Sequence, residues 1–97
     1  MKAEYIDPEL KDFINGIPKP IEKEVGYSFD IAKRILDVLH KKGWSRSDLA
    51  KATGKRESEI TRWLSGTHNY TIRTIALIES ALGEEIISVK RYRRSQS

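Results

Sequence analysis

The segment LAKATGKRESEITRWLSG, residues 49–66, sets two apolar patches around Gly54 and crowds Arg, Glu, Ser and Thr between them. Ser45 precedes it as an N-cap, and Asp48 three residues later completes a variant of the capping box, which predicts a short helix through Ala52. Gly54 is expected to end that helix. A second helix is expected from Glu57, because acidic residues in a first turn suit the helix dipole.

The second helix is predicted to run for nine residues and to be closed by Gly66. At 100° per residue, Ile60, Trp63 and Leu64 share one face of it, and Leu49 with Ala50 supplies the facing surface on the first helix. Two short helices joined by a turn of three or four residues that contains Gly form a helix-turn-helix. The second helix of such a pair can enter the major groove of DNA.

The opposite side of the second helix is polar. It carries Ser58, Arg62 and Ser65, flanked by Thr61, with Lys55, Arg56 and Glu57 at the N-terminal end. Arg can address guanine bidentately, Ser and Thr can serve several base edges, and Glu can accept from cytosine. The competing interpretation is an ordinary solvated helix face, which the pairing of the helices, the glycine turn and the local charge make less favourable.

Charge is distributed unevenly along the chain, whose net charge is +4. Residues 1–30 carry 4 basic and 7 acidic groups, residues 31–66 carry 9 and 4, and residues 67–97 carry 5 and 3. The excess of positive charge therefore lies in the block that holds the two short helices. A bias confined to one segment indicates a polyanionic partner for that segment.

The remaining pattern is mostly helical. Asp7 followed by Pro8 predicts a helix over 8–15. Apolar residues at intervals of three and four predict helix over 19–42, either as one helix or as two with a break near Gly26. Thr71 as N-cap and Gly83 as C-cap bound a further helix over 71–82. Alternating β-branched residues predict a short strand near 85–91, and the tail beyond it is expected to be loose.

Several classes of protein are disfavoured. The chain has 97 residues, enough for one domain, and no Cys, so no disulfide scaffold or thiolate metal site is available and a cytoplasmic location is expected. No stretch is long and apolar enough to cross a membrane. His68 has no partner in a catalytic or metal-ligand pattern, so neither a catalytic site, a metal nor another cofactor is predicted. Trp44 and Trp63 are expected in the core.

The quoted segment resembles the helix-turn-helix of the XRE/Cro family of phage-repressor-like regulators. WSRSDLA before it and TIRTIALIESALG after it extend the resemblance over residues 29–83. The resemblance implies a mainly α, repressor-like domain of about five helices, here with a short C-terminal strand. The chain is then a single domain, 1–97, with an N-terminal helical extension (1–28), a helix-turn-helix core (29–83) and a C-terminal strand with a basic tail (84–97).

Carried over by position, the resemblance implies two sets of DNA contacts. The base-contacting set is Arg56, Glu57, Ser58 and Arg62, with Thr61 as a further candidate. The phosphate-contacting set is Arg46, at the start of the first motif helix, and Thr67, His68, Asn69 and Tyr70 after the closing Gly. The sequence departs from the family pattern at Arg56, where a capping Ser or Thr is common, and at Thr53 and Lys55, where apolar residues are common.

The leading functional hypothesis is a sequence-specific regulator of transcription that binds double-stranded DNA, a dimeric repressor that regulates its own expression. One short recognition helix reads few bases, so a homodimer is expected, with the strand near 85–91 as a candidate for pairing across the two-fold axis. The alternative is an antitoxin, resembling the HigA-like antitoxins, that binds a basic toxin protein through the acidic residues 1–30. An enzyme is the least supported class.

Overall fold

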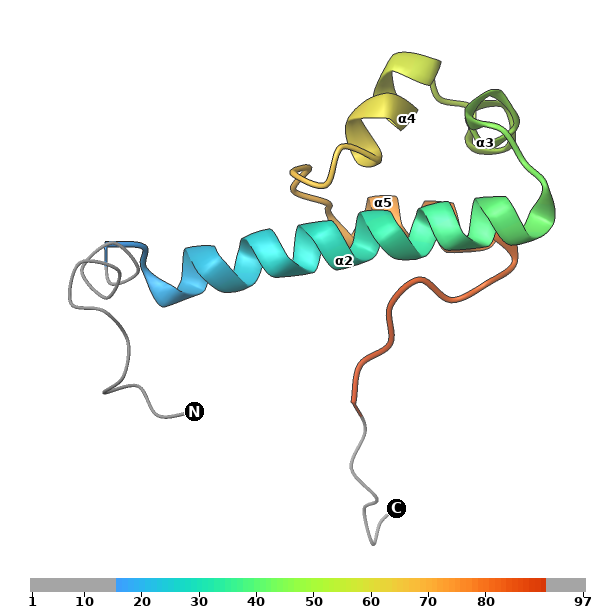
Figure 1. Cartoon of the computed structure of the whole chain (residues 1–97). Coiled ribbons are helices and arrows are strands. Elements are labelled where there is room, and N and C mark those ends of the chain that lie inside the picture. The colour runs from blue at the N-terminus through green and yellow to red at the C-terminus, as the bar shows by residue number, and fades with distance from the viewer. Residues whose placement is uncertain (1–15, 91–97) are drawn as a thin grey trace, which may run out of the picture.

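The computed structural model describes residues 16–90, and Figure 1 labels its four helices α2 to α5. They are α2 (Lys19–Lys42), α3 (Arg46–Thr53), α4 (Glu57–Trp63) and α5 (Ile72–Leu82). In Figure 1, α2 runs along one side of the other three helices, and its blue N-terminal half extends beyond them. The expected helix over 8–15 and the basic residues 91–94 lie outside the described residues.

Residues 19–42 form one continuous helix, which settles the question of a break near Gly26. Gly26 has no heavy atom within 4 Å of where a Cβ would lie, and no proline interrupts the helix after its first turn. Gly43 ends the helix in the left-handed conformation at φ 72°, and its N–H donates to the carbonyls of the last turn.

The capping predicted for α3 and α5 is present. Ser45 Oγ accepts from the Asp48 N–H at 3.1 Å, and the Asp48 carboxylate accepts from the Ser45 N–H at 2.8 Å. The bond from the Ser45 N–H holds the pKa of Asp48 below its usual value, because it stabilises the charged carboxylate, and the Ser45 side chain adds to this effect. Thr71 Oγ1 accepts from the Thr74 N–H at 3.0 Å and starts α5 in the same way.

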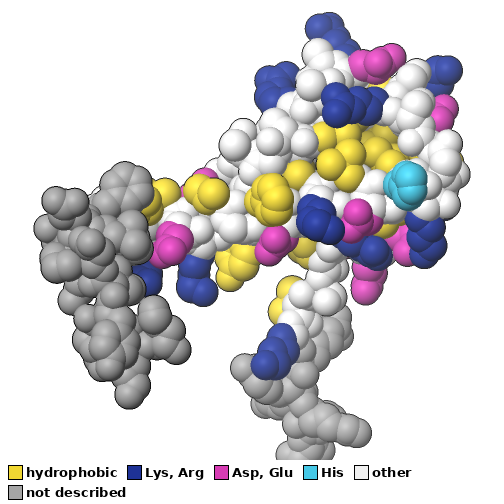
Figure 2. All heavy atoms as spheres, viewed as in Figure 1, with side chains coloured by type: hydrophobic (Ala, Val, Ile, Leu, Met, Phe, Trp, Pro, Cys, Tyr) yellow, Lys and Arg dark blue, Asp and Glu magenta, His cyan; other side chains and the backbone are white. Residues whose placement is uncertain are grey.

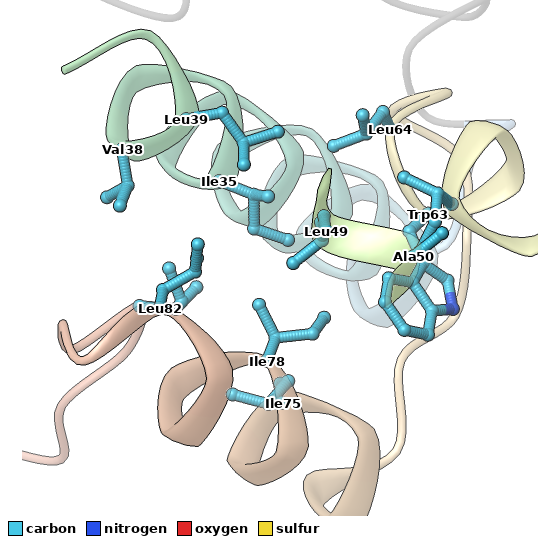
Figure 3. Close-up of a cluster of buried hydrophobic side chains, with 12 residues drawn as sticks. Ile35, Val38, Leu39, Leu49, Ala50, Trp63, Leu64, Ile75, Ile78 and Leu82 are labelled. Atoms are coloured by element: carbon cyan, nitrogen blue, oxygen red, sulfur yellow. The ribbon is translucent and has the colours of Figure 1, made fainter. Parts of the chain in front are cut away.

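The core joins the inner faces of all four helices, as the close-up in Figure 3 shows. The predicted faces of the helix-turn-helix are confirmed: Leu49 and Ile60 are fully buried, and Trp63 is 4% exposed. The buried apolar residues are Ala32, Ile35, Val38, Leu39, Leu49, Ala50, Ile60, Trp63, Leu64, Ile75, Ile78, Leu82 and Ile86. Trp44 is half-buried against this cluster, as expected for a core residue rather than one that stacks on bases.

Two predictions about helices α2 and α4 need correction. α4 has seven residues and ends at Trp63, not at Gly66, because Leu64 leaves the helical conformation and its N–H closes the last turn on Ile60. Along α2, only some of the apolar residues whose spacing predicted the helix are buried. Ile21 and Val25 are 50% and 58% exposed, because no other described element lies over that end of the helix.

The strand predicted near 85–91 is also wrong for the part that the structure describes. Residues 84–90 have no strand or helix conformation. The N–H groups of Ile86 and Ile87 donate to the Glu79 carboxylate at 2.7 and 3.0 Å, instead of to a neighbouring strand. Ile86 is thereby held against the core, where it is 8% exposed. The alternation of β-branched residues reflects this anchoring and not a sheet. In residues 16–90, the protein is all α.

Candidate nucleic-acid interface

Helices α3 and α4 together present one polar surface, and both helices pack on the hydrophobic core through their inner faces. Leu49 and Ala50 of α3 and Ile60 and Trp63 of α4 are buried on the inner side of the pair, and α3 also contacts α5. Burial of these four side chains fixes how the two short helices cross. It leaves their outer faces exposed, and Figure 2 shows Lys and Arg side chains gathered around this end of the molecule.

All the predicted base-contacting residues lie on the outer side of α4 or at its start. Arg56, Glu57, Ser58, Thr61 and Arg62 are all exposed. Since α4 spans only seven residues, it brings these side chains within about two helical turns, a length of about 10 Å. An exposed polar surface of this size matches the few base pairs that one recognition helix can address in this motif.

Arg56 is the N-cap of α4, although its side chain makes no capping bond. The cap is instead made by Glu59, whose carboxylate accepts from the Arg56 N–H at 3.2 Å. The departure from a capping Ser or Thr therefore does not displace the start of α4, which begins at Glu57 as predicted. It also leaves the guanidinium of Arg56 exposed rather than engaged in the cap.

Arg46, predicted to contact phosphate, stands at the first residue of α3. Its Nη1 donates to Thr61 Oγ1 at 3.4 Å, a long hydrogen bond that connects α3 to the middle of α4. Arg46 and Thr61 are both exposed, so the two sets predicted to contact phosphates and bases meet at this point. Their separation in sequence gave no indication of this contact.

The loop after α4 is ordered by its own hydrogen bonds. Ser65 Oγ donates to the Arg62 carbonyl at 2.8 Å and lies 3.0 Å from Thr67 Oγ1, and it accepts from the Thr67 N–H at 3.2 Å. Gly66 has a φ of 89°, a backbone conformation that residues other than glycine rarely adopt. Ser65 thus fixes where Thr67 lies relative to α4, a role that its place on the polar face alone did not suggest.

Two aromatic rings complete this loop. The Tyr70 hydroxyl donates to the Trp63 carbonyl, one of the carbonyls left free at the end of α4. Burial raises the pKa of Tyr70 to about 12, so the hydroxyl stays protonated and able to donate. His68 stands edge-on to Tyr70, with ring centroids 4.8 Å apart.

The surroundings of His68 favour the neutral form of its imidazole. Partial burial lowers its pKa below the ordinary value of 6.5, and the positive charge of Arg62 lowers it further. The loop therefore brings His68 into the electrostatic range of a predicted base-contacting residue. Thr67 and Asn69 on either side are exposed, whereas Tyr70 is half-buried, with its hydroxyl engaged inside the fold.

Across residues 16–90, no three side chains of His, Asp or Glu come close enough together to hold a metal ion. None of the helices in that range combines the length and the apolar character needed to cross a membrane.

Comparison with known proteins identifies the class to which this fold and surface belong. A helix-turn-helix family matches residues 33–87, more than half of the chain, and the chain belongs to this family of XRE/Cro-type DNA-binding domains. The match covers α3, α4 and α5 whole and begins inside α2. It implies a DNA-binding regulator, and it does not single out the HigA-like antitoxins. No curated protein and no solved structure matches the chain.

Proposed function

We propose that the protein is a dimeric transcriptional repressor that reads a specific DNA sequence through α4. The observation that carries the proposal is the contact between Arg46 and Thr61, which joins the start of α3 to the exposed face of α4. In a helix-turn-helix, the first helix crosses the phosphate backbone and the second enters the major groove. The contact supports the proposal because it brings the guanidinium of Arg46 next to the exposed face of α4.

Within this proposal the side chains divide by role. Arg56, Glu57, Ser58 and Arg62 face base edges, with Thr61 beside them. Arg46 and the loop residues Thr67, His68 and Asn69 face phosphates. Tyr70 is a special case, because its hydroxyl is already bonded to the Trp63 carbonyl. Its contribution to DNA binding is to hold the loop in place, and contact with a phosphate falls to its neighbours.

The test is selection of binding sites from random double-stranded DNA by the full chain. We expect a near-palindromic site whose half-sites lie about 34–36 Å apart, one turn of the duplex, as required for two copies of α4 on the same side of DNA. Binding should weaken steeply with salt, since phosphate neutralisation releases counterions. Recovery of unrelated sequences with the same affinity as scrambled DNA would refute sequence-specific reading.

The antitoxin role is the second candidate, and one observation favours it. Ile21 and Val25 are exposed on the half of α2 that extends beyond α3 and α4, so a protein partner could be bound there without covering α4. The discriminating experiment is co-expression of the chain with the product of a small basic reading frame next to its own. Co-purification, together with rescue of growth arrest, would assign the antitoxin role.

A further inference from the structure

One row of mostly apolar positions along α2, here called the seam, continues toward the N-terminus beyond the part of α2 that α3, α4 and α5 cover. Its positions alternate by four and three residues, the spacing of a helix that packs along another helix. They are Ile21, Val25, Ser28, Ala32, Ile35 and Leu39. From Ser28 onward every member is buried by this chain. Ile21 and Val25 belong to the same seam and are 50% and 58% exposed, because the arm that carries them extends beyond α3, α4 and α5.

A groove borders this arm on one side. It has a volume of about 850 Å³ and lies between α2, the first turn of α5 and the C-terminal segment. Its apolar walls come from Tyr27 and Ile31, from Ile72 and Ile75, and from Ile86 and Val89. Tyr27, Ile72 and Val89 are among the most exposed large apolar side chains of the described residues, at 63%, 75% and 77%.

The seam and the groove together have the size of a protein interface. Their exposed large side chains, with Ile17 just before α2, are Ile17, Ile21, Val25, Tyr27, Ile72 and Val89. At about 100 Å² of exposed surface each, six such side chains present on the order of 600 Å², close to the roughly 800 Å² that one partner contributes to a standard interface. Isolated exposed apolar residues need no explanation, but six of them on one arm and around the groove that borders it indicate a partner.

The charge of this surface favours an identical partner. Residues 17–30 carry two basic side chains, Lys19 and Lys23, and three acidic ones, Glu22, Glu24 and Asp30. A nearly balanced arm does not repel a second copy of itself, whereas capture of a basic protein would call for a strong acidic excess there. A seam with coiled-coil spacing also suits its own copy, because the same apolar row then lies on both sides of a two-fold axis.

We propose that a second copy of this chain covers this surface. The arms of the two copies, residues 17–29, each comprise the start of α2 and the two residues before it, and they pack against each other through Ile21 and Val25. Each arm borders the groove of its own protomer, where Val89 of the C-terminal segment adds to the contact. The inference rests on the proposed dimeric regulator and names its interface. No residue of α3 or α4 lines the groove, so pairing here leaves the proposed base-facing residues of both copies exposed. Of the proposed phosphate-facing residues, Asn69 alone lies at the edge of the groove.

The first test introduces charged side chains into the seam and measures the mass of the protein in solution. We expect light scattering to give a mass near twice 11.2 kDa for the full chain and for Leu36→Glu, a matched control on α2 whose side chain is 42% exposed and lies outside the groove. The double variant Ile21→Glu and Val25→Glu should give half that mass. Both replaced residues are exposed in the single chain, so circular dichroism should show the helix content of the parent chain. Thermal unfolding should come at a lower temperature and no longer depend on protein concentration, because the stability added by dimerisation is lost. A monomeric parent chain, or a double variant that stays dimeric, overturns the proposal.

Cross-linking then tests the position of the two-fold axis. The chain has no Cys, so a single introduced thiol reports only on its own surroundings. Val25→Cys should form a disulfide-linked dimer on mild oxidation, whereas Leu36→Cys should remain monomeric in denaturing gels. Cross-linking at residue 36 but not at 25 would place the contact elsewhere and reject the seam. A chain that is monomeric alone and binds a different protein through Ile21 and Val25 would also reject it.

DNA binding separates failure of the interface from failure of the function. The monomeric double variant should keep its affinity for a single half-site. It should lose on the order of 100-fold on a full two-half-site DNA, the advantage gained by linking two binding modules. A chain that reads DNA as a monomer would refute the interface and leave α4 as the reading helix. A chain that is dimeric but binds all DNA sequences equally would refute the proposed function, while the proposed interface would stand.

Discussion

Arg46 Nη1 lies 3.4 Å from Thr61 Oγ1, so the first residue of α3 and the exposed middle of α4 meet on one surface. Arg62, the next residue along α4, is exposed beside Thr61. The two arginines carry the same charge and differ in position: Arg46 stands at the start of the helix that crosses the DNA backbone in this motif, and Arg62 on the helix that enters the groove. Their variants should therefore fail in different ways.

Arg62→Ala should lower affinity for the selected site by about 1–3 kcal/mol and relax the preference at one or two base positions. The reason is that a guanidinium on the outer face of α4 can bond a guanine edge bidentately, and alanine cannot. Binding to scrambled DNA should fall less. The measurement is a fluorescence titration against both DNAs, together with repeated site selection. Equal losses on both would remove base reading from Arg62.

Arg46→Ala should weaken binding to every sequence alike and reduce the slope of log K against log salt by about 0.9, the contribution of one phosphate contact. Specificity should survive, since α4 keeps its base-facing residues. A salt titration of the variant on selected and scrambled DNA measures both quantities. An unchanged slope would show that Arg46 does not face a phosphate, and Lys19→Ala, on the arm of α2, serves as a control for loss of charge.

His68 is predicted to make DNA binding depend on pH. In the free protein its pKa is lowered below 6.5, so the imidazole is neutral at pH 7. A phosphate beside it would favour the protonated form, so binding would take up a proton. Affinity should then rise as the pH falls from about 8 to 6, by up to about tenfold per pH unit. His68→Gln should abolish this rise, and the matched variant His40→Gln, exposed on α2, should keep it. Identical profiles for all three proteins would take His68 out of the phosphate set.

The same shift has a consequence for stability, with a definite sign. Because the folded state lowers the pKa of His68, the unfolded chain binds the proton more readily between the folded pKa and 6.5. The contribution of His68 to folding is therefore complete above pH 6.5 and is lost as the pH falls below it. Denaturant unfolding of the free protein should show a smaller loss on acidification for His68→Gln than for the parent chain.

The fold of α3 and α4 was predictable because local signals and periodicity agree there. Ser45 and Asp48 fix the start of α3, Gly54 its end, and the spacing of Ile60 and Trp63 identifies the inner face of α4. The same spacing assigned the polar residues of α4 to the outer face, where they are exposed. Contacts between helices, such as that of Arg46 with Thr61, depend on the crossing of the two helices, which periodicity does not specify.

The sequence pattern failed where tertiary contacts decide. Ile21 and Val25 continue the periodicity of the buried residues, and the pattern alone cannot tell that the other helices do not reach them. The C-terminal residues alternate as a strand would, but their amide groups are satisfied by a carboxylate seven and eight residues earlier, in α5. A side chain that replaces a strand neighbour leaves no mark in β-propensity, because propensity describes the segment and not its partner.

Glu79 is accordingly predicted to anchor the C-terminal segment. Its Oε2 accepts from the N–H groups of Ile86 and Ile87, and Ile86 packs into the core next to this anchor. Glu79→Ala should lower the free energy of unfolding by about 1–3 kcal/mol, since two hydrogen bonds to a charged acceptor are lost while the freed amides regain water. Glu79→Gln keeps one acceptor oxygen, so its free energy of unfolding should lie between that of the parent chain and that of Glu79→Ala. Urea unfolding measures the loss, and amide hydrogen exchange at Ile86 and Ile87 should accelerate in Glu79→Ala but not in Ser80→Ala, an exposed neighbour on α5. Unchanged exchange at both amides would mean that Glu79 is not the anchor, and that burial of Ile86 and the two hydrogen bonds from Arg34 to the Glu85 carbonyl hold the segment.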